Sequence, residues 1–326
     1  MSVALPLTLA LLAVTGCAER SAHTFREMAM GTECALTIHA TDPEQARSAA
    51  RLAMDRIHQL DHDLSDWLPD GELASLQGRA GVPRKLSPDL CAALRTGLQV
   101  NRESDGLFDP ALRPLVVVWR EARRTGVFPT AGQLEAARRE SGCRHLQLDS
   151  SACQITIDSE IVPIDLGAIG KGFAAEEAYR LLQAGGHPDS LVAVGGDIRC
   201  GTPPPGRSGW EVTIDDGLLP PIRVTLSEVA ISTSGDREQS AFVQGRPVGH
   251  IIDPRTGNPL NRPTAVTVIA ADGATADAWA SALCVAGPEY ARTLAPNCIR
   301  WRVTAVQGAD RVTATSPEFP AWINHD

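Results

Sequence analysis

The sequence predicts a single α+β unit. Segments with apolar residues at helical spacing are interspersed with segments of strand-like alternation, and no regular βαβ order joins them. The 326 residues contain no internal repeat, no low-complexity block and no linker between two independent units. A chain of this length carries enough apolar residues to bury a large core.

The first half of the chain predicts one strand and three helices. A strand over 34–40 ("CALTIHA") precedes a helix over 43–65, which Asp42-Pro43 opens. Helical spacing of the apolar residues predicts two more helices, over 87–104 and 130–141.

Later segments add strands, a loop and a last helix. Alternation of apolar and polar residues predicts strands over 145–149, 154–158 and 210–215. The Gly- and Pro-rich stretch "GTPPPGRSG" predicts an exposed loop. A strand over 264–271 and a helix over 275–287 complete the expected order of elements.

The charge of the chain excludes one class of partner. The formal net charge is −9 and no basic tract interrupts the sequence. A surface that binds a phosphate backbone needs an excess of Lys and Arg. We therefore expect no nucleic-acid partner.

Residues 1–16 predict a signal peptide, because their apolar run is of signal-peptide length and too short for a permanent membrane span. The small residues 14–16 followed by Cys17 resemble a bacterial lipobox, which implies lipid on Cys17 and export to a membrane facing the periplasm. No Lys or Arg precedes the run, so an ordinary secretory signal or a disordered start is the alternative. Residues 17–25 are expected to be a tether, and 26–326 the domain.

Seven cysteines follow Cys17, so they cannot all be paired with one another. Cys143 and Cys153 flank a predicted hairpin and could bond in an exported protein, although two free thiols fit the sequence equally well. No CxxC spacing supports a cysteine-based zinc site.

A glycine-rich corner over 161–186 ("IVPIDLGAIGKGFAAEEAYRLLQAGG") predicts an anion site. An apolar strand is expected to end at Asp165, and a helix to begin near Lys171. Unpaired N–H groups at the helix start, together with Lys171, suit a phosphate group. The spacing fits neither GxGxxG nor GxxxxGK[ST]. The alternative is a tight strand-to-helix corner with a surface lysine.

Two further segments deliver small or hydroxyl residues at the ends of apolar strands. One runs into Gly195, Gly196 and Asp197, and the other predicts a turn over 232–235, which contains Thr233, Ser234 and Gly235. Each alone is more often a simple turn. Together with the glycine-rich corner they predict a cleft for a large phosphorylated ligand.

Asp277 and Ser281 stand four residues apart on a predicted helix, hence on one face. A carboxylate, a hydroxyl and nearby carbonyl groups are the hard oxygen ligands that Mg²⁺ prefers. By spacing alone, an Asp near a helix start with a small packing serine is the commoner reason for this pair.

His250 lies in "VGHIIDPRTGNPL", between an apolar run and a polar turn. A histidine titrates near neutrality, so it can accept a proton from an attacking hydroxyl. A lone histidine is more often a hydrogen-bonded core residue. The nearby Asp253 and the stiffening Pro254 favour a functional position, and "HII" is expected to end a strand that points His250 into the cleft.

Seven motifs then occur in order, and together they resemble the FAD:protein FMN transferase (ApbE) family from about Met30 to Gly287. They are "MGT" (30–32), "DGLFDPALRPLVVVW" (105–119), "IDLGAIGKGFAAE" (164–176), "GGDIR" (195–199), "ISTSGD" (231–236), "GHIIDPRTGNP" (249–259) and "ADAWASAL" (276–283).

The resemblance implies a single two-lobed, T-fold-related flavin transferase domain with FAD, the substrate, in a cleft between the lobes. Such enzymes transfer FMN from FAD through a phosphoester to a Thr or Ser of an acceptor protein and release AMP. A membrane redox subunit is the acceptor that the resemblance suggests.

The resemblance also implies residue roles. Mg²⁺ is expected on Asp277, Ser281 and the carbonyl of Ala168, with Ser281 standing where the family usually has Thr. His250 is the expected catalytic base. The residues expected to contact or line the site of FAD are Met30, Trp67, Asp109, Lys171, Gly195, Gly196, Asp197, Thr233, Ser234, Gly235, His250 and Asp253.

Two other functions fit the same motifs. A Mg²⁺-dependent FAD pyrophosphatase would use water in place of the protein hydroxyl and give free FMN and AMP. A periplasmic FAD-binding protein would hold the flavin without turnover, although the presence of His250 and Asp277 disfavours a pure binder.

Overall fold

The structure, a computed structural model, describes residues 20–66, 68–235 and 241–319. Its largest element is an eight-stranded sheet in which every neighbouring pair is antiparallel. In sheet order the strands are β1 (Ser21–Ala29), β2 (Thr32–Ala40), β6 (Ser190–Val194), β7 (Asp197–Cys200), β10 (Val229–Gly235), β15 (Thr264–Ala270), β16 (Arg300–Gln307) and β17 (Asp310–Thr315).

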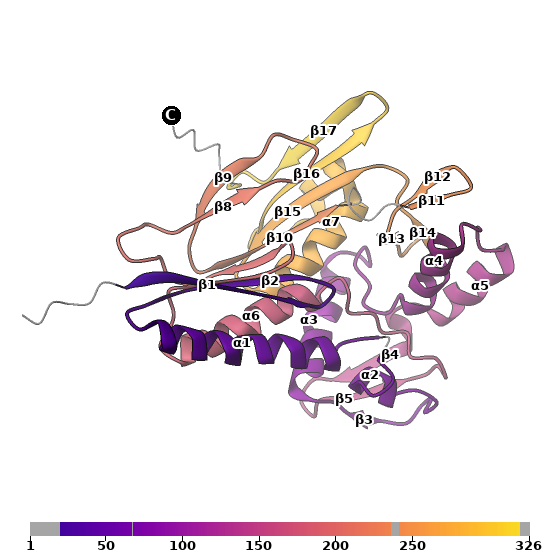
Figure 1. Cartoon of the computed structure of the whole chain (residues 1–326). Coiled ribbons are helices and arrows are strands. Elements are labelled where there is room, and N and C mark those ends of the chain that lie inside the picture. Colours follow the sequence, from indigo (N-terminus) through magenta and orange to yellow (C-terminus); the bar gives the residue numbers. More distant parts are fainter. Residues whose placement is uncertain (1–19, 67, 236–240, 320–326) are drawn as a thin grey trace, which may run out of the picture.

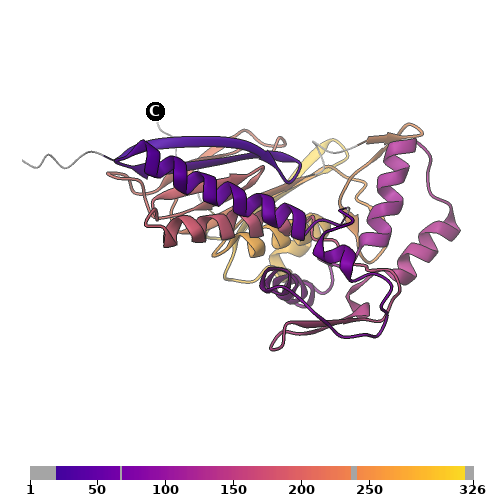
Figure 2. The ribbon, with the colours of Figure 1, turned by 60° about the horizontal axis from the view of Figure 1, so that its bottom comes forward.

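Three helices cover one face of this sheet: α1 (Pro43–Asp63), α6 (Gly170–Ala184) and α7 (Gly273–Leu294) (Figures 1 and 2). The hairpin of β8 (Trp210–Ile214) and β9 (Ile222–Leu226) packs on the opposite face. Because the middle of the sheet is covered on both sides, every residue of β15 is buried. The alternating buried residues of β2 instead face α1 and α6 alone.

A second lobe lies beside the three helices of the sheet (Figure 1). It contains α2 (Glu72–Ser75), α3 (Pro88–Glu103) and the three-stranded sheet β3 (Arg84–Lys85), β5 (Gln154–Ile157) and β4 (Leu146–Asp149), with a short 3₁₀ turn at Cys143–His145. Buried residues of α3 and of this sheet join those of α7 in one hydrophobic core. The two lobes are therefore packed together as one unit.

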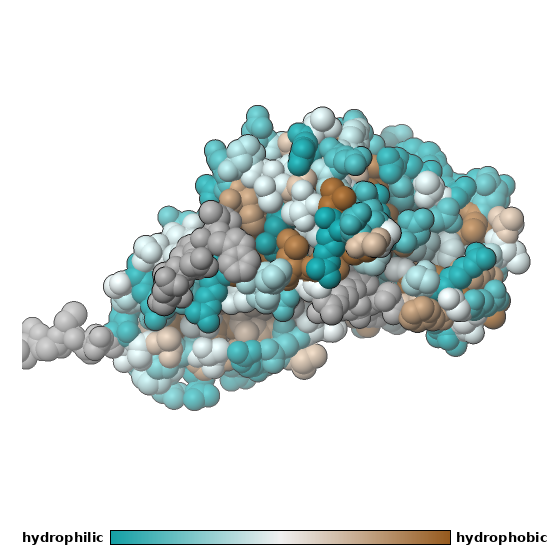
Figure 3. Space-filling view, turned by 90° about the horizontal axis from the view of Figure 1, so that it is seen from above, coloured by the Kyte–Doolittle hydropathy of each residue, from teal (hydrophilic) through white to brown (hydrophobic). Residues whose placement is uncertain are grey.

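A smaller cluster forms one end of the molecule. There α4 (Arg113–Thr125) and α5 (Ala131–Glu140) pack against the hairpins β11 (Ala241–Val243)–β12 (Arg246–Val248) and β13 (Ile252–Asp253)–β14 (Asn258–Pro259). Hydrophobic residues appear on the surface of this end (Figure 3). Phe242 in β11 is 72% exposed. No helix of the described residues is long and apolar enough to cross a membrane.

The predicted α+β class is confirmed, as are the helices expected from periodicity, which are α1, α3, α5 and α7. The helix expected to end at 287 does change direction at Gly287, whose φ of 74° is not helical, and Pro288 follows. The expected strands correspond to β2, β4, β5, β8 and β15.

Two local predictions were wrong. The stretch expected to be a tether over 17–25 is part of β1 from Ser21 onward, because its backbone pairs with β2 along the edge of the sheet. The segment ending at Asp165 is not a strand. Its backbone groups are hydrogen-bonded to the segment before α4 instead. The Asp165 N–H donates to the carbonyl of Pro110, and the Pro163 carbonyl accepts from the Arg113 N–H.

The turn predicted over 232–235 was also wrong. These residues form the end of β10, where Ser232 pairs with both Val268 and Asp197, and Gly235 pairs with Ala265. Small and hydroxyl residues favour turns, but pairing with β15 along the whole segment, and with β7 at Ser232, fixes these residues as extended backbone.

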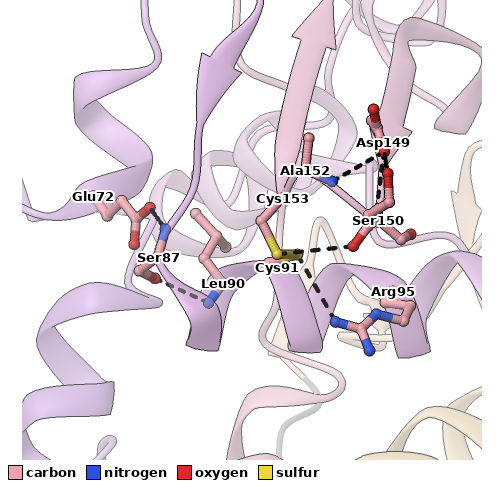
Figure 4. Close-up of a disulfide and its surroundings, with 10 residues drawn as sticks. Glu72, Ser87, Leu90, Cys91, Arg95, Asp149, Ser150, Ala152 and Cys153 are labelled. Atoms are coloured by element: carbon pink, nitrogen blue, oxygen red, sulfur yellow. Dashed lines mark hydrogen bonds between the residues drawn. A yellow bond between two sulfur atoms is a disulfide. The ribbon is translucent and has the colours of Figure 1, made fainter.

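The disulfide differs from both alternatives offered by the sequence. Cys153 bonds to Cys91 of α3, and Cys143 is a free thiol (Figure 4). The Cα atoms of Cys91 and Cys153 are 5.6 Å apart, across 62 residues of sequence. The bond ties α3 to the sheet beside it. Cys143 instead donates its S–H to the Asp109 carboxylate, over 3.0 Å.

Candidate active site

A cavity of about 330 Å³ lies between the α6–α7 corner and helix α4 with the loop before it. It is lined by the loop before α4, by α4 itself, by the turn before α6, by α7 and by the segment between β12 and β13. Seven residues predicted from the sequence line it: Asp109, Ala168, Lys171, Ser234, His250, Asp277 and Ser281.

The remaining predicted residues are not among the described residues that line this cavity, and Trp67 lies outside the described residues. Met30 occupies a turn with φ of 52° and donates its N–H to Asp61 over 2.7 Å. The Asp253 carboxylate bonds to Arg255 over 2.8 Å. The others lie in or beside β7 and β10: Gly195, Gly196, Asp197, Thr233 and Gly235.

The turn between β6 and β7 explains two of the predicted glycines. Gly195 has φ of 59°, and a Cβ there would lie 2.9 Å from the Thr32 hydroxyl. Gly196 accepts a hydrogen bond from the Thr233 N–H at 3.3 Å. These glycines therefore allow a tight turn between two strands of the sheet. Asp197 follows this turn and contacts Lys171.

Close approach of two helices brings Lys171 to Asp277. A Cβ on Gly172 of α6 would lie 2.1 Å from the carbonyl oxygen of Gly273 in α7, so only glycine fits at this crossing. Because the two helices lie so close together, the N–H of Gly172 can donate to the Asp277 carboxylate over 3.1 Å. The start of α6 thus supplies both a backbone donor and an ammonium group to one buried carboxylate.

Lys171 lies between two carboxylates. Its Nζ is 2.8 Å from Oδ2 of Asp197 and 3.5 Å from Oδ2 of Asp277. Burial disfavours the ammonium, but the two carboxylates outweigh burial and raise the pKa of Lys171. Lys171 is therefore a fixed positive charge in the cavity wall.

The Asp277 carboxyl is nearly inaccessible, at 2% exposure. Burial and the neighbouring Asp197 raise its pKa to about 6, against the opposing effect of Lys171 and of the Gly172 N–H. The site thus carries excess negative charge that a further cation would stabilise.

Asp277 and Ser281 stand one turn apart on α7, and both line the cavity with Ala168. Among the described residues, no group of three or more His, Cys, Asp or Glu side chains is arranged to hold a metal. A metal here would therefore rely on one carboxylate, a hydroxyl and a carbonyl oxygen. That donor set, completed by water and phosphate oxygens, fits Mg²⁺ and does not fit zinc.

His250 lies in a bend between β12 and β13, so the expectation that "HII" ends a strand was wrong. The bend is held from its far side. The Ile251 carbonyl accepts from Leu260 over 2.9 Å, and the Asp253 carbonyl accepts from Gly257 over 2.8 Å. The polar tail of this segment is the turn that holds His250 at the cavity wall.

Sequence reasoning missed one acid and two arginines of the cavity. Burial and nearby Asp66 raise the pKa of Asp165, against a hydrogen bond from the Gly167 N–H. Arg120 and Arg123 line the cavity from α4 together with Val116. Val116, Arg120 and Arg123 are spaced at i, i+4 and i+7, which places them on one face of a helix, and this spacing could have predicted them as a group.

Known proteins resemble this chain over most of its length. The ApbE family model matches residues 30–303. The "FAD:protein FMN transferase" of Salmonella typhimurium is 29% identical over 331 residues, covering 96% of this chain and 92% of that protein. The protein of the same name from Rhodobacter capsulatus is 32% identical over 266 residues, which cover 79% of this chain and 50% of that protein.

Solved structures agree. The flavin transferase ApbE from Vibrio cholerae superimposes with a TM-score of 0.80 at 25% identity, covering 92% of this chain and 99% of that one. The apo flavinyl transferase ApbE from Pseudomonas stutzeri gives a TM-score of 0.82 at 26% identity, covering 93% of this chain and 97% of that one.

Proposed function

The chain belongs to the ApbE family, and we propose that its cavity binds FAD and Mg²⁺ and transfers FMN to a Thr or Ser hydroxyl of an acceptor protein. The enzyme is a FAD:protein FMN transferase. The observation that carries the proposal is the convergence, on one cavity, of the Asp277–Ser281 pair, the Lys171 ammonium and His250.

Asp277, Ser281 and the carbonyl of Ala168 are the residues that would hold the metal. When bound, Mg²⁺ would supply positive charge to offset the negative charge that develops on the diphosphate oxygens. Lys171 adds a fixed positive charge to the same wall. Burial and the neighbouring Asp197 disfavour the charged form of Asp277, so a cation beside it would stabilise that carboxylate. This support is electrostatic.

His250 accepts the proton of the acceptor hydroxyl. The hydroxyl oxygen attacks the phosphorus on the FMN side, a new phosphoester bond forms, and the bond to the bridging oxygen breaks. AMP leaves with that oxygen. A neutral hydroxyl is a weak nucleophile, so a positioned base contributes a factor of about 10² to 10⁴ in rate.

The apolar wall of the cavity suits the ring systems of FAD. Leu107, Phe108, Leu112, Val116 and Val285 line it beside the polar corner. Trp67 is proposed to stack on the isoalloxazine, and Met30 and Asp109 to complete the flavin site. Asp109 would contact FAD while its carboxylate also holds the Cys143 N–H and thiol.

We also propose that the protein is exported and held at a membrane by lipid on Cys17, facing the periplasm, with a membrane redox subunit as acceptor. The disulfide between Cys91 and Cys153 supports an oxidising compartment, where such bonds persist. The lipobox residues lie outside the described part of the chain.

The test is incubation of the purified chain with FAD and Mg²⁺, with and without an acceptor fragment that bears a Thr or Ser flavinylation site. The transferase adds one FMN to the intact mass of the acceptor and releases AMP. Free FMN and AMP with an unmodified acceptor indicate a pyrophosphatase. FAD that is bound but never cleaved indicates a flavin carrier. Replacement of Mg²⁺ by excess chelator abolishes transfer if the metal proposal holds.

A further inference from the structure

A buried network of charges surrounds the proposed metal ligand. The Lys171 ammonium contacts Asp197 at 2.8 Å and Asp277 at 3.5 Å, and these two carboxylate side chains are only 4% and 2% exposed. The Ser232 hydroxyl donates to the other oxygen of Asp197. Asp197 itself is not among the described residues that line the cavity, whereas Lys171 and Asp277 are.

The network fixes where the lysine charge stands. Asp197 lies on β7 and Ser232 on β10, so both belong to the rigid central sheet. Their hydrogen bonds hold the carboxylate that in turn holds Lys171. The contact of Lys171 with Asp197 is 2.8 Å and that with Asp277 is 3.5 Å, so Asp197 is the closer carboxylate that holds the ammonium.

The charges of the three side chains do not cancel. Two carboxylates and one ammonium leave a net charge of −1 around the metal position. As long as both carboxylates are ionised, replacement of Lys171 by a neutral residue would leave −2, and neutralisation of Asp197 would leave 0. A divalent cation is attracted in proportion to that charge, and little water separates the groups to screen it.

We propose that Lys171 is a built-in counter-ion of Asp277 that weakens Mg²⁺ binding to the FAD-free protein and thereby makes tight metal binding depend on FAD. The FAD diphosphate brings two negative charges, which attract both Lys171 and the metal. Asp197 is a positioning residue, because it acts by holding the ammonium in place. The inference rests on the proposed function for the identity of the metal and of the nucleotide.

Reciprocity follows from this arrangement. If FAD raises the affinity for Mg²⁺ by some factor, then Mg²⁺ raises the affinity for FAD by the same factor. A neutral residue at position 171 is expected to change the two separate binding steps in opposite directions. It strengthens the binding of metal alone, and it weakens the binding of FAD alone.

The experiment is calorimetric titration of MgCl₂ into the FAD-free protein. Lys171→Met is expected to tighten the Mg²⁺ Kd about tenfold, and Asp197→Asn to weaken it by a similar factor. Lys171→Arg, the matched control, keeps the charge and stays within about twofold of the wild type. FAD titrated in excess EDTA is expected to bind Lys171→Met several-fold more weakly.

Lys171→Met and Asp197→Asn are expected to change the Mg²⁺ affinity in opposite directions, which makes the test decisive. Equal or weaker Mg²⁺ binding by Lys171→Met overturns the inference, provided that its thermal unfolding matches that of the wild type, and Lys171→Gln serves as a second neutral variant. Asp277→Ala separates this failure from that of the proposed function. If Asp277→Ala binds Mg²⁺ as the wild type does, the metal site itself is wrong.

Discussion

The indole nitrogen of Trp119 donates a 2.8 Å hydrogen bond to the carbonyl oxygen of Gly257. Trp119 is buried in α4, one residue before Arg120 of the cavity wall, and Gly257 closes the turn that follows His250. The bond therefore fixes the histidine loop to a helix that lines the same cavity.

Trp119→Phe is expected to leave the Gly257 carbonyl without its donor while filling most of the same volume. The free energy of unfolding should fall by about 1–3 kcal/mol, because a buried acceptor loses its partner. FMN transfer should slow several-fold as the His250 loop loosens. Urea unfolding and initial transfer rates measure the two effects.

Trp210→Phe is the matched control. The Trp210 indole also donates to a backbone carbonyl, that of Thr202, over 3.0 Å, but from the β8–β9 side of the sheet. This variant should lose similar stability and keep the wild-type transfer rate. An equal loss of activity in both variants would mean that the Trp119 bond has no special part in placing His250.

The elements that the sequence predicted well are those decided by local pattern. Helix α1 has Asp42 as its cap, which accepts from the Glu44 N–H, and buried apolar residues at helical spacing. Helix α3 is capped in the same way by Ser87. Such signals need no knowledge of distant residues.

The elements that were missed depend on distant partners. Ser232 and Gly235 are extended only because β7 and β15 pair with them. The bond between Cys91 and Cys153 joins residues 62 positions apart, which no local spacing predicts. For the site, the sequence predicted seven of the residues that line the cavity, but not that Asp197 holds Lys171 from outside the cavity lining.

The disulfide should carry a large part of the stability of the second lobe. Cross-linking across 62 residues is worth about 4 kcal/mol in the chain-entropy model. The double variant Cys91→Ser/Cys153→Ser should therefore unfold at a clearly lower temperature than the wild type. Thermal unfolding with and without reductant checks this, since only the wild type should respond to the reductant.

Cys298→Ser is the control for this prediction, because Cys298 is an exposed free thiol. It should unfold at the wild-type temperature and respond to reductant as the wild type does. Identical unfolding of the double variant and the oxidised wild type would contradict a stabilising role for the bond.

Gly172→Ala should push α6 and α7 apart where they approach each other. The added Cβ would lie within 2.8 Å of backbone and side-chain atoms of α7, including Asp277, and backbone cannot yield as a flexible side chain does. Overpacking of this kind costs about 1–3 kcal/mol. Both the free energy of unfolding, measured with urea, and the affinity for Mg²⁺ should fall.

Gly132→Ala tests the same substitution where space is open. Gly132 lies in α5, and a Cβ there meets no atom within 4 Å. Alanine should stabilise this helix by about 0.5–1 kcal/mol. If both alanines act with the same sign, the close approach of α6 and α7 does not determine the effect.

The pH dependence of stability should carry a contribution from His39. Burial lowers its pKa, against the opposing effect of Asp189. The unfolded chain therefore binds this proton more readily than the folded one. The contribution is fully present above about pH 6.5, the ordinary value for histidine, and is lost as pH falls below it.

Urea unfolding of the wild type and of His39→Gln at several pH values measures this contribution. The difference in unfolding free energy between the two proteins should narrow as pH falls from about 7 toward 5. A difference that widens on acidification would reverse the assigned direction, and a constant difference would show that His39 makes no such contribution.

His250→Ala tests the central claim most directly, namely that this cavity transfers FMN with His250 as the base. FAD affinity should remain within about twofold of the wild type, since the apolar wall, Lys171 and the metal ligands are intact, while the rate of FMN transfer to the acceptor should fall by about 10² to 10⁴. Single-turnover transfer, followed by acceptor mass, gives that rate. A variant that binds FAD normally and transfers FMN at the wild-type rate would remove His250 from the reaction and contradict the account.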